Sequence, residues 1–596
     1  MHVLGISCFF HDAAAALVTD GVLLAAAEEE RFTRKKHDFE FPLHAIDYVL
    51  KAGKISSEDI DYVTFFEKPF LKLERILMTS LQMFPRGATL FREAMITWLL
   101  DKLWVSALIT EKLGIPRDRV LFSEHHLSHA ASAFFCSPFD EAAIMTVDGV
   151  GEWATATTGR GTGTHISLAR EVRFPHSIGL LYSTFTAFLG FEVNEGEYKV
   201  MGMAPYGTPR YADQVRQLVR MEPDGSFRLD MSYFAFHRST TTPYTSKFLR
   251  LFGDPRPPDG KFFTEASGYP AYFGPRPADY AGELKRNQHY ADIAASIQLV
   301  TEELVVNMAR ALQRQTGLRR LCIAGGVGLN SVANARILRE TEFEELYVHP
   351  AAGDSGGAVG AALYAYHSML GKPRGFVMEH AYWGQRYSDD EVRAFLDGEG
   401  LRYERLDDDR LLDRTVEALA EGKVVGWFQD RFEWGPRALG NRSILADPRR
   451  AEMKDIVNTK IKFREPYRPF APSVLSEHVH TYFDAPGVER QYPARFMLLV
   501  VDVQPSKRDV IPAVTHVDGT GRLQTVVRET NPRYYDLIQR FGAATGVPVL
   551  LNTSFNLRGE PIVNTPQNAF STFSRSGLDM LVLGNHVVRK ENDHDV

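Results

Sequence analysis

The stretch that most constrains the fold is a long helix followed by a buried strand and a glycine turn. Residues 290–317 form an amphipathic helical pattern that ends at a glycine, and residues 321–324 follow as a short apolar strand. Gly325, Gly326 and Asn330 lie in the turn before the next helical segment. Such a turn lets the backbone approach a ligand closely, and a helix amino terminus favours negative charge. The stretch therefore predicts an α/β chain with a nucleotide-binding turn.

The chain is too long for one hydrophobic core, since it has 596 residues. Residues 365–380 change in character and carry Gly-Lys-Pro-Arg-Gly, which predicts a domain boundary there. We expect one domain over residues 1–366 and a second α/β domain over residues 367–596. Within the first, residues 208–288 are rich in Pro, Tyr and Phe with weak periodicity, and they are interpreted as an insert that shapes a substrate pocket.

Composition excludes several classes of protein. The formal net charge of −7 argues against a general nucleic-acid coat. The three cysteines, Cys8, Cys136 and Cys322, are far apart, so neither a disulfide framework nor a zinc ribbon is indicated. The amino terminus lacks a basic region before its apolar part, and no uncharged apolar run approaches membrane-spanning length. We therefore expect a cytoplasmic protein that binds neither membrane nor nucleic acid.

Two histidines and two aspartates suggest a metal site. His125 and His129 lie four residues apart in an alanine-rich helical run, so both imidazoles share one helix face. Asp148 ends the strand-like run that follows, and Asp354 opens a later small-residue helix. Two imidazoles with carboxylates suit iron, manganese or zinc. The alternatives are a packed histidine pair and a helix-capping role for Asp354.

Two further stretches could serve a nucleotide or an acceptor. The first residues form strands around a tight turn at residues 19–21, and His11 and Asp12 lie between the first two apolar segments. Sugar or phosphate contacts could come from an acidic, lysine-containing segment with Glu195, Gly196 and Lys199. Any β-hairpin and any polar loop would explain the same patterns.

The second half concentrates positive charge. Across residues 431–468, ten Lys and Arg face five Asp and Glu, although the whole chain is net acidic. Guanidinium groups on glycine- and proline-shaped loops suit a small phosphate dianion, and a solvated basic face is the alternative. The candidate anion-binding residues are Arg437, Arg442, Lys462, Arg464, Arg522, Asn552, Ser554, Asn556 and Arg558.

The order of these pieces resembles a duplicated actin/hexokinase-like ATPase domain. More specifically, GISCFFHDAAAAL, HHLSHAASAF, GEYKVMGMAPYG, GGVGLNS, EWGPRALGNRSILADPR, REPYRPFAP and NTSFNLRGEPIV resemble the NodU/CmcH-type O-carbamoyltransferases. The resemblance runs from residue 1 to about residue 585. It implies that the duplicated ATPase-like domain is followed by a YrdC-like α/β domain.

The resemblance also implies a two-step reaction. Carbamoyl phosphate and ATP would give carbamoyl adenylate and pyrophosphate in the second domain, where Lys462 and Arg464 match a Lys-x-Arg motif and Ser554 and Asn556 a Ser-x-Asn motif. A hydroxyl of a natural product, such as a macrolide or an aminoglycoside, would then take the carbamoyl group in the first domain. The implied metal ligands are His125, His129, Asp148 and Asp354, with Fe(II) as the metal and Mg²⁺ accompanying ATP. The implied nucleotide contacts come from the turn of Gly149, Val150 and Gly151, from the 195–199 segment and from the 325–330 turn.

The acceptor hydroxyl needs a base, because a neutral alcohol is a poor nucleophile. His11 and Asp12 are the candidates, and the alternative is that they only orient loops. Three other functions remain open: threonylcarbamoyl-type transfer to tRNA, a sugar-kinase-like ATPase that produces ADP, and a non-catalytic ATP-dependent interaction protein. The sequence does not identify the acceptor, the metal or the oligomeric state.

Overall fold

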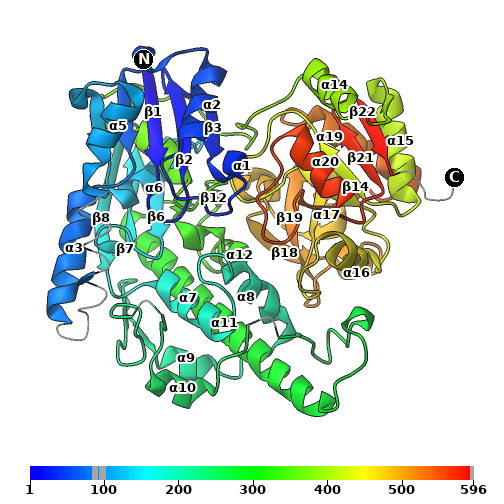
Figure 1. Ribbon diagram of the computed structural model, residues 1–596. Coiled ribbons are helices and arrows are strands. Elements are labelled where there is room, and N and C mark those ends of the chain that lie inside the picture. Colours follow the sequence, from blue (N-terminus) through cyan, green and yellow to red (C-terminus); the bar gives the residue numbers. More distant parts are fainter. Residues whose placement is uncertain (84–90, 93–94, 96–101, 240, 259, 591–596) are drawn as a thin grey trace. The chain divides into compact units, whose positions relative to one another are not determined.

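The computed structural model describes residues 1–83, 91–92, 95, 102–239, 241–258 and 260–590 (Figure 1). It divides into two compact units. The first consists of Met1–Ala26 and Phe39–Met378, and the second of Ala27–Asp38 and Glu379–Val596. No helix among the described residues combines the length and the hydropathy needed to span a bilayer.

The first unit contains two five-stranded sheets with the same topology. In the order in which the strands lie, one sheet is β3-β2-β1-β4-β5 and the other is β8-β7-β6-β11-β12. In each, the central strand pairs antiparallel with the next strand of the chain and parallel with a later one. This repeat confirms the predicted duplicated, actin-like architecture. The strands are β1 (His2–Ser7), β2 (Ala14–Thr19), β3 (Val22–Glu28), β4 (Tyr62–Phe65), β5 (Val120–Phe122), β6 (Glu141–Val147), β7 (Ala154–Thr162), β8 (His165–Arg173), β11 (Arg320–Ala324) and β12 (Glu345–Val348).

Two small-residue helices pack closely in this unit. Helix α6 (His125–Phe134) has nine buried residues of its ten, and α13 (Gly356–Tyr364) is almost wholly buried. A Cβ atom at Gly360 of α13 would lie 1.8 Å from the carbonyl oxygen of Ser128 on α6. Only a glycine fits there, because protein interiors leave no room for an extra methyl group. The close approach fixes α6, and with it the histidines that it carries.

The predicted long helix is present as α11 (Tyr280–Thr316), and Gly317 ends it in the left-handed conformation. This helix begins inside the predicted insert of residues 208–288. The described residues of the insert before it include a hairpin of β9 (Val219–Met221) and β10 (Phe227–Leu229) and a short helix α10 (Ser246–Phe252). Phe248 of α10 is buried against Phe234, also buried, and against Phe185. Part of the aromatic content of this insert therefore forms core.

The second unit is built on a ten-stranded mixed sheet, which confirms the predicted α/β class. Its strand order is β13-β22-β21-β14-β15-β20-β16-β19-β18-β17. Helices α14 (Asp389–Gly398), α15 (Asp408–Ala420), α19 (Pro532–Thr545) and α20 (Pro566–Ser574) accompany it (Figure 1). The strands are β13 (Glu404–Arg405), β14 (Val425–Phe428), β15 (Arg442–Ala446), β16 (Ala471–Leu475), β17 (Phe483–Asp484), β18 (Leu499–Val503), β19 (Thr520–Val526), β20 (Val549–Ser554), β21 (Met580–Leu583) and β22 (His586–Arg589).

A short segment from the start of the chain belongs to this second unit. Charged residues dominate residues 28–42, a composition typical of an exposed loop. Instead, Glu28, Glu29 and Arg31 are buried, and the four-residue helix α1 (Glu30–Thr33) lies in their midst. The pattern of charges along the segment carries no sign of this burial.

Candidate functional site

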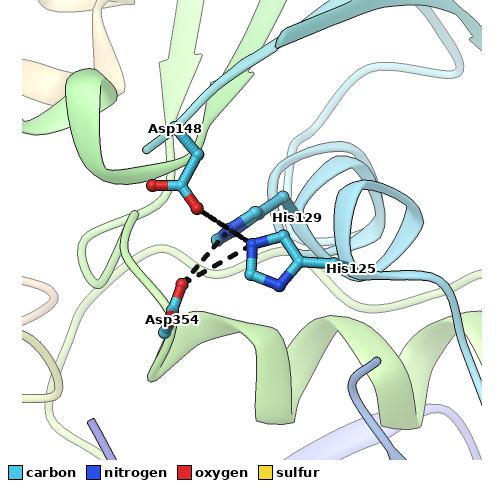
Figure 2. A group of neighbouring side chains, drawn as sticks. All are labelled: His125, His129, Asp148 and Asp354. Carbon is cyan, nitrogen blue, oxygen red and sulfur yellow. Dashed lines mark hydrogen bonds and ion pairs between the residues drawn. The ribbon is translucent and has the colours of Figure 1, made fainter. Parts of the chain in front are cut away.

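Four side chains converge in the first unit, as predicted. His125, His129, Asp148 and Asp354 each offer one ligand atom, and these atoms all lie within 4.8 Å of one another (Figure 2). The Nε2 atoms of the two histidines are 3.0 Å apart. Asp148 Oδ2 lies 2.9 Å from His125 Nε2, and Asp354 Oδ1 lies 3.7 Å from the same atom.

The fold explains why these residues meet. His125 and His129 lie one turn apart on α6, whose alanines pack inward. Strands β6, β11 and β12 run parallel, so their carboxyl ends share one edge of the sheet. Asp148 directly follows β6, and Asp354 follows β12 and precedes α13. The Asp354 side chain faces the histidines, and Ser355 occupies the N-cap position of α13, so the capping alternative for Asp354 is not what the structure shows.

The four residues fit a divalent cation. Among the described residues, Oδ2 of Asp354 is buried and has no hydrogen-bond partner, while the histidine Nε2 atoms face each other and the carboxylates. One proton shared between the two imidazole nitrogens cannot serve both nitrogens and both carboxylates. A metal ion can bind all four groups at once. The set of two nitrogen and two oxygen donors suits iron, manganese or zinc.

The electrostatic field around this group is negative. Burial lowers the pKa of His125, but its hydrogen bond to Asp148 and its contact with Glu67 outweigh burial and raise the pKa to about 10. Burial also raises the pKa of Asp148, and the two histidines overcome that effect and hold it well below its usual value. A field that retains a proton on a buried imidazole attracts a metal cation at the same place.

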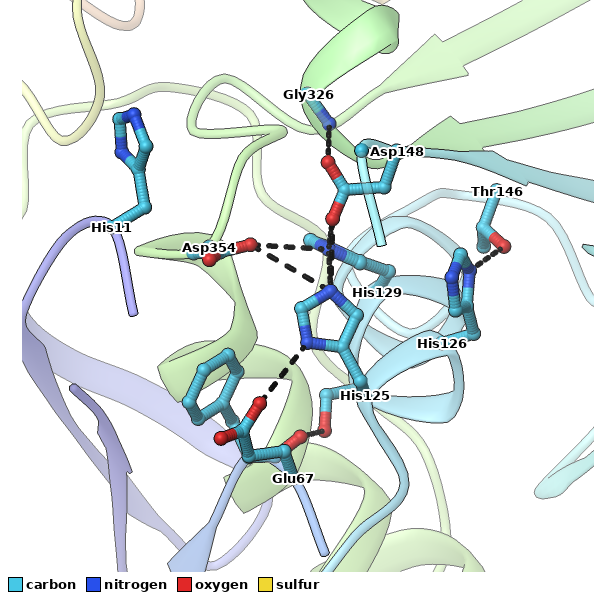
Figure 3. Close-up of polar contacts among 12 residues, drawn as sticks. His11, Glu67, His125, His126, His129, Thr146, Asp148, Gly326 and Asp354 are labelled. Atoms are coloured by element: carbon cyan, nitrogen blue, oxygen red, sulfur yellow. Dashed lines mark hydrogen bonds and ion pairs between the residues drawn. The ribbon is translucent and has the colours of Figure 1, made fainter. Parts of the chain in front are cut away.

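Several neighbours of the metal-binding group were not predicted from the sequence (Figure 3). Glu67 Oε2 lies 3.7 Å from His125 Nδ1 and 2.6 Å from Lys72 Nζ. Glu152 accepts a hydrogen bond from the His125 backbone N–H at 2.9 Å. His126 bonds Thr146 Oγ1 at 2.7 Å, and burial and the two neighbouring histidines lower its pKa to about 3. Glu67 follows a short strand, as Asp148 does, and this position was the one sequence feature that could have pointed to a role for Glu67 near the metal-binding group.

His11 lies close to this group, as Figure 3 shows. Its Nδ1 pairs with Asp12 Oδ2 at 2.9 Å, and its Nε2 lies 3.2 Å from the carbonyl oxygen of Asn194. Burial lowers the pKa of His11, but Asp12 outweighs burial, with help from Asp354, and the pKa rises to about 10. Both ring nitrogens therefore donate, and within this pair Asp12 is the group that can accept a proton.

Some of the predicted nucleotide-binding residues contact the metal-binding group directly, and others lie next to residues that contact His11. Gly326 N–H donates to Asp148 Oδ1 at 3.2 Å, and Gly151 packs against the His125 ring. Gly149 accepts a hydrogen bond from Ser177 through its carbonyl oxygen, and Val150 is buried. The segment with Glu195, Gly196 and Lys199 begins directly after Asn194, the partner of His11.

Asn330 has a structural role in addition to any ligand contact. Its Oδ1 accepts the Ala333 N–H and so caps helix α12 (Ser331–Glu340), and its side chain also bonds Gln298. The turn at 325–330 and the turn at 149–151 thus lie beside the metal-binding group, while the Asn330 side chain is largely occupied within the fold.

The second unit brings the two predicted motifs together around Lys462. Its Nζ lies 2.6 Å from Asn556 Oδ1, 2.7 Å from the Ser554 carbonyl oxygen and 2.9 Å from the Asn556 carbonyl oxygen. Ser554 Oγ in turn donates to Asn556 Oδ1 at 2.7 Å. Burial, and then Arg464 and Arg468, lower the pKa of Lys462 well below its usual value. An anion bound beside Lys462 would offset this repulsion.

The cationic cluster consists of Lys462, Arg437, Arg464 and Arg522, with Arg468 nearby. Burial, Arg437, Arg464 and Arg468 together lower the pKa of Arg522, so these guanidinium groups lie near one another. Arg464 Nε donates to Asn458 Oδ1 at 2.7 Å, which orients its guanidinium group. Arg522 Nε is buried without a hydrogen-bond partner among the described residues. Guanidinium groups that repel one another, together with the unpartnered Nε of Arg522, are typical of an anion-binding site.

Not every residue of the predicted anion site faces this cluster. Arg442 is wholly buried over the Phe428 ring, and its two NH₂ groups donate to backbone carbonyls including those of Gln429 and Asp430. Its two NH₂ groups are therefore used within the fold rather than directed at a phosphate, although its Nε has no hydrogen-bond partner among the described residues. Asn552 is buried, and its amide bonds Ser473 and Gln524 in the sheet, whereas Arg558 is exposed.

Comparison with known proteins matches both halves of the chain to one enzyme family. A profile described as "Carbamoyltransferase N-terminus" matches residues 2–363, and one described as "Carbamoyltransferase C-terminus" matches residues 416–590. A Synechocystis protein, sll1178, is 46% identical, with 99% of this chain and 97% of the relative aligned. Nodulation protein NolNO of Sinorhizobium fredii is 38% identical over 98% of this chain and 79% of its own length.

A third relative carries an enzyme name. The 3'-hydroxymethylcephem-O-carbamoyltransferase of Amycolatopsis lactamdurans is 28% identical, with 96% of each chain aligned. The two profiles together span most of the chain, and the metal-binding group and the cationic cluster lie within the residues that they match. The chain belongs to the carbamoyltransferase family and is a carbamoyltransferase.

Proposed function

We propose that the protein moves the carbamoyl group of carbamoyl phosphate, by way of carbamoyl adenylate, to a hydroxyl group of a natural product. The observation that carries the proposal is the cluster of Lys462, Arg437, Arg464 and Arg522 in a chain that is otherwise net acidic. Carbamoyl phosphate is a small dianion, and such a concentration of guanidinium and ammonium groups suits its phosphate.

The first step belongs to the second unit. Water cleaves carbamoyl phosphate to carbamate and inorganic phosphate, and the carbamate oxygen then attacks the α-phosphorus of ATP, so that pyrophosphate leaves. The arginines neutralise the phosphate oxygens, and Lys462, held by Ser554 and Asn556, stabilises the charge that develops during transfer. Mg²⁺ accompanies the ATP phosphates.

The second step belongs to the first unit. The acceptor hydroxyl attacks the carbamoyl carbon, the bond from that carbon to the adenylate oxygen breaks, and AMP leaves. Asp12 accepts the hydroxyl proton, and His11, positively charged beside it, stabilises the developing negative charge. The turns that hold Gly151 and Gly326 approach the nucleotide through their backbones. A metal held by His125, His129, Asp148 and Asp354, which we propose is Fe(II), would supply Lewis-acid polarisation of the carbonyl.

The relatives support a hydroxylated natural product as the acceptor. One is named for nodulation, and another is named for O-carbamoylation of a hydroxymethylcephem. We propose that this protein tailors a comparable secondary metabolite, such as an antibiotic, in the cytoplasm, where ATP and carbamoyl phosphate are available.

Mass spectrometry tests the proposal. The protein is incubated with ATP, carbamoyl phosphate and a panel of hydroxylated macrolides, aminoglycosides and cephems. The expected product gains one carbamoyl unit, and AMP, pyrophosphate and phosphate accumulate in equal amounts. Production of ADP would indicate a kinase, and transfer to tRNA in place of the small alcohols would indicate threonylcarbamoyl-type chemistry; either result contradicts the proposal.

A further inference from the structure

The segment Ala27–Asp38, although it lies near the start of the chain, is bound to the loops of the second unit that carry the cationic cluster. One of these loops contains Gly435 and Arg437, and the other runs from Asn556 to Ile562. The sequence offers no reason to connect the segment with either loop, since more than 400 residues separate them.

The segment holds the first loop at a single glycine. Glu28 Oε1 accepts the Gly435 N–H at 2.7 Å, and an Arg31 NH₂ group donates to the Gly435 carbonyl oxygen at 2.7 Å. Arg31 Nε also donates to Glu28 Oε2 at 3.3 Å, and both side chains are buried. Gly435 has a φ of +103°, which residues other than glycine rarely adopt. The buried side chains of Glu28 and Arg31 therefore fix the conformation of a glycine two residues before Arg437.

The segment holds the second loop through Arg34. One of its NH₂ groups donates to the Ile562 carbonyl oxygen at 2.6 Å, and the other donates to the Pro561 carbonyl oxygen at 2.7 Å. This loop also contains Asn556, whose Nδ2 donates to the Glu560 carbonyl oxygen and whose Oδ1 accepts from Lys462 Nζ. A guanidinium fork that binds two successive carbonyls orients the loop more tightly than one contact could.

The segment itself is ordered by its own side chains. Thr33 Oγ1 donates to Asp38 Oδ2 at 2.8 Å, and the His37 N–H donates to Glu30 Oε2 at 2.9 Å. These bonds close the residues after α1 into a compact turn. Lys36, within this turn, adds to the positive field that Lys462 experiences.

We propose that Glu28, Arg31 and Arg34 are positioning residues for the carbamoyl-phosphate site: they hold the Gly435–Arg437 loop and the Asn556–Ile562 loop in the geometry that binds the anion. The inference rests on the proposed function of the cationic cluster. A segment near the start of the chain would then serve the formation of carbamoyl adenylate, whereas the rest of the amino-terminal half serves carbamoyl transfer to the acceptor.

Three variants of the full chain test this role. Glu28→Gln keeps one acceptor for Gly435 and loses the carboxylate that binds Arg31. Arg31→Lys keeps the charge and loses the fork. Arg34→Gln acts on the other loop and lies in a less buried position. Arg449→Lys is the matched control, because Arg449 makes a comparable two-pronged contact, to Asp447, in the same unit and away from both loops.

Two readouts separate positioning from folding. Calorimetric titration with inorganic pyrophosphate measures anion binding without turnover, and pyrophosphate release from ATP gives the KM for carbamoyl phosphate. In Glu28→Gln and Arg34→Gln we expect the dissociation constant of pyrophosphate and the KM for carbamoyl phosphate each to rise at least fivefold. The kcat should change less than threefold, and the metal content should not change. For Arg31→Lys we expect both of these constants to lie between those of the two variants and those of the wild type. For Arg449→Lys we expect the wild-type values.

The inference is overturned if folded Glu28→Gln and Arg34→Gln bind pyrophosphate as the wild type does, or if Arg449→Lys loses as much affinity as they do. Failure of the proposed function looks different. In that case the wild type itself releases no pyrophosphate from ATP and carbamoyl phosphate, and the dissociation constants for added pyrophosphate still decide the positioning role.

Discussion

His125 Nε2 and His129 Nε2 face each other across 3.0 Å, with Asp148 Oδ2 2.9 Å from the first and 3.4 Å from the second. The two histidines lie four positions apart on one helix, while the aspartate follows the end of a strand. This convergence of neutral and negative donors in a buried position is the basis for the metal that we propose.

Replacing one ligand should empty the metal site. We expect His129→Ala to retain less than a tenth of the metal of the wild type after dialysis, because three donors bind a divalent ion far less tightly than four. Inductively coupled plasma mass spectrometry measures the content. His126→Gln is the control, since His126 is equally buried but bonds Thr146 and the Ala154 carbonyl oxygen. Full metal content in folded His129→Ala would exclude the histidine as a ligand.

Packing between two helices should limit what position 360 tolerates. Gly360→Ala places a methyl group 1.8 Å from the Ser128 carbonyl oxygen, so α6 or α13 must shift. We expect a loss of about 1–3 kcal/mol in stability and weaker metal binding, because the displaced residue adjoins His129. Thermal unfolding and metal content measure the two effects.

Gly398 provides the control for this substitution. It also lies in a helix, α14, and nothing lies within 4 Å of an added Cβ atom. Gly398→Ala should be neutral or stabilising by up to about 1 kcal/mol. If Gly360→Ala unfolds at the temperature of the wild type, the close approach of α6 and α13 is not as described.

A buried histidine should make the second unit sensitive to acid. Burial, with Arg522 and Lys454, lowers the pKa of His516 from 6.5 to about 4 against the opposing effect of Asp518. Because the folded-state pKa lies below the unfolded value, the contribution of His516 is complete above pH 6.5 and is lost as the pH falls through 4. It amounts to at most about 3 kcal/mol.

Thermal unfolding between pH 7.5 and pH 4.5 tests this linkage. We expect the midpoint of His516→Gln to fall less over this range than that of the wild type, whereas a change at the exposed His480 should leave the pH profile as it is. Parallel profiles for His516→Gln and the wild type would contradict the assignment.

Much of the fold and the metal-binding group could be predicted because both depend on local patterns. The end of α11 at Gly317 followed from a periodic helix and its glycine cap. Asp148 and Asp354 could be placed together because each follows a strand, and parallel strands bring their carboxyl ends to one edge. His125 and His129 needed only helical spacing.

Other features depend on long-range contacts that residue type does not reveal. Arg442 counted as a free positive charge in the sequence, yet its donors bind backbone carbonyls within its own unit. Arg31 stood in a highly charged stretch, yet it is buried against Gly435. Glu67 had no spacing that tied it to His125. In each case the deciding partner is remote in the chain, and neither periodicity nor composition identifies it.

The central claim is that the cationic cluster activates carbamoyl phosphate and that the histidine–aspartate group transfers the carbamoyl unit. Quantifying pyrophosphate and carbamoylated acceptor in parallel, with Lys462→Met and His129→Ala, tests this division most directly. We predict that Lys462→Met lowers pyrophosphate release at least a hundredfold and yields no product, while His129→Ala still releases pyrophosphate but carbamoylates no acceptor. Undiminished pyrophosphate release by Lys462→Met, or normal product formation by metal-free His129→Ala, would contradict the account.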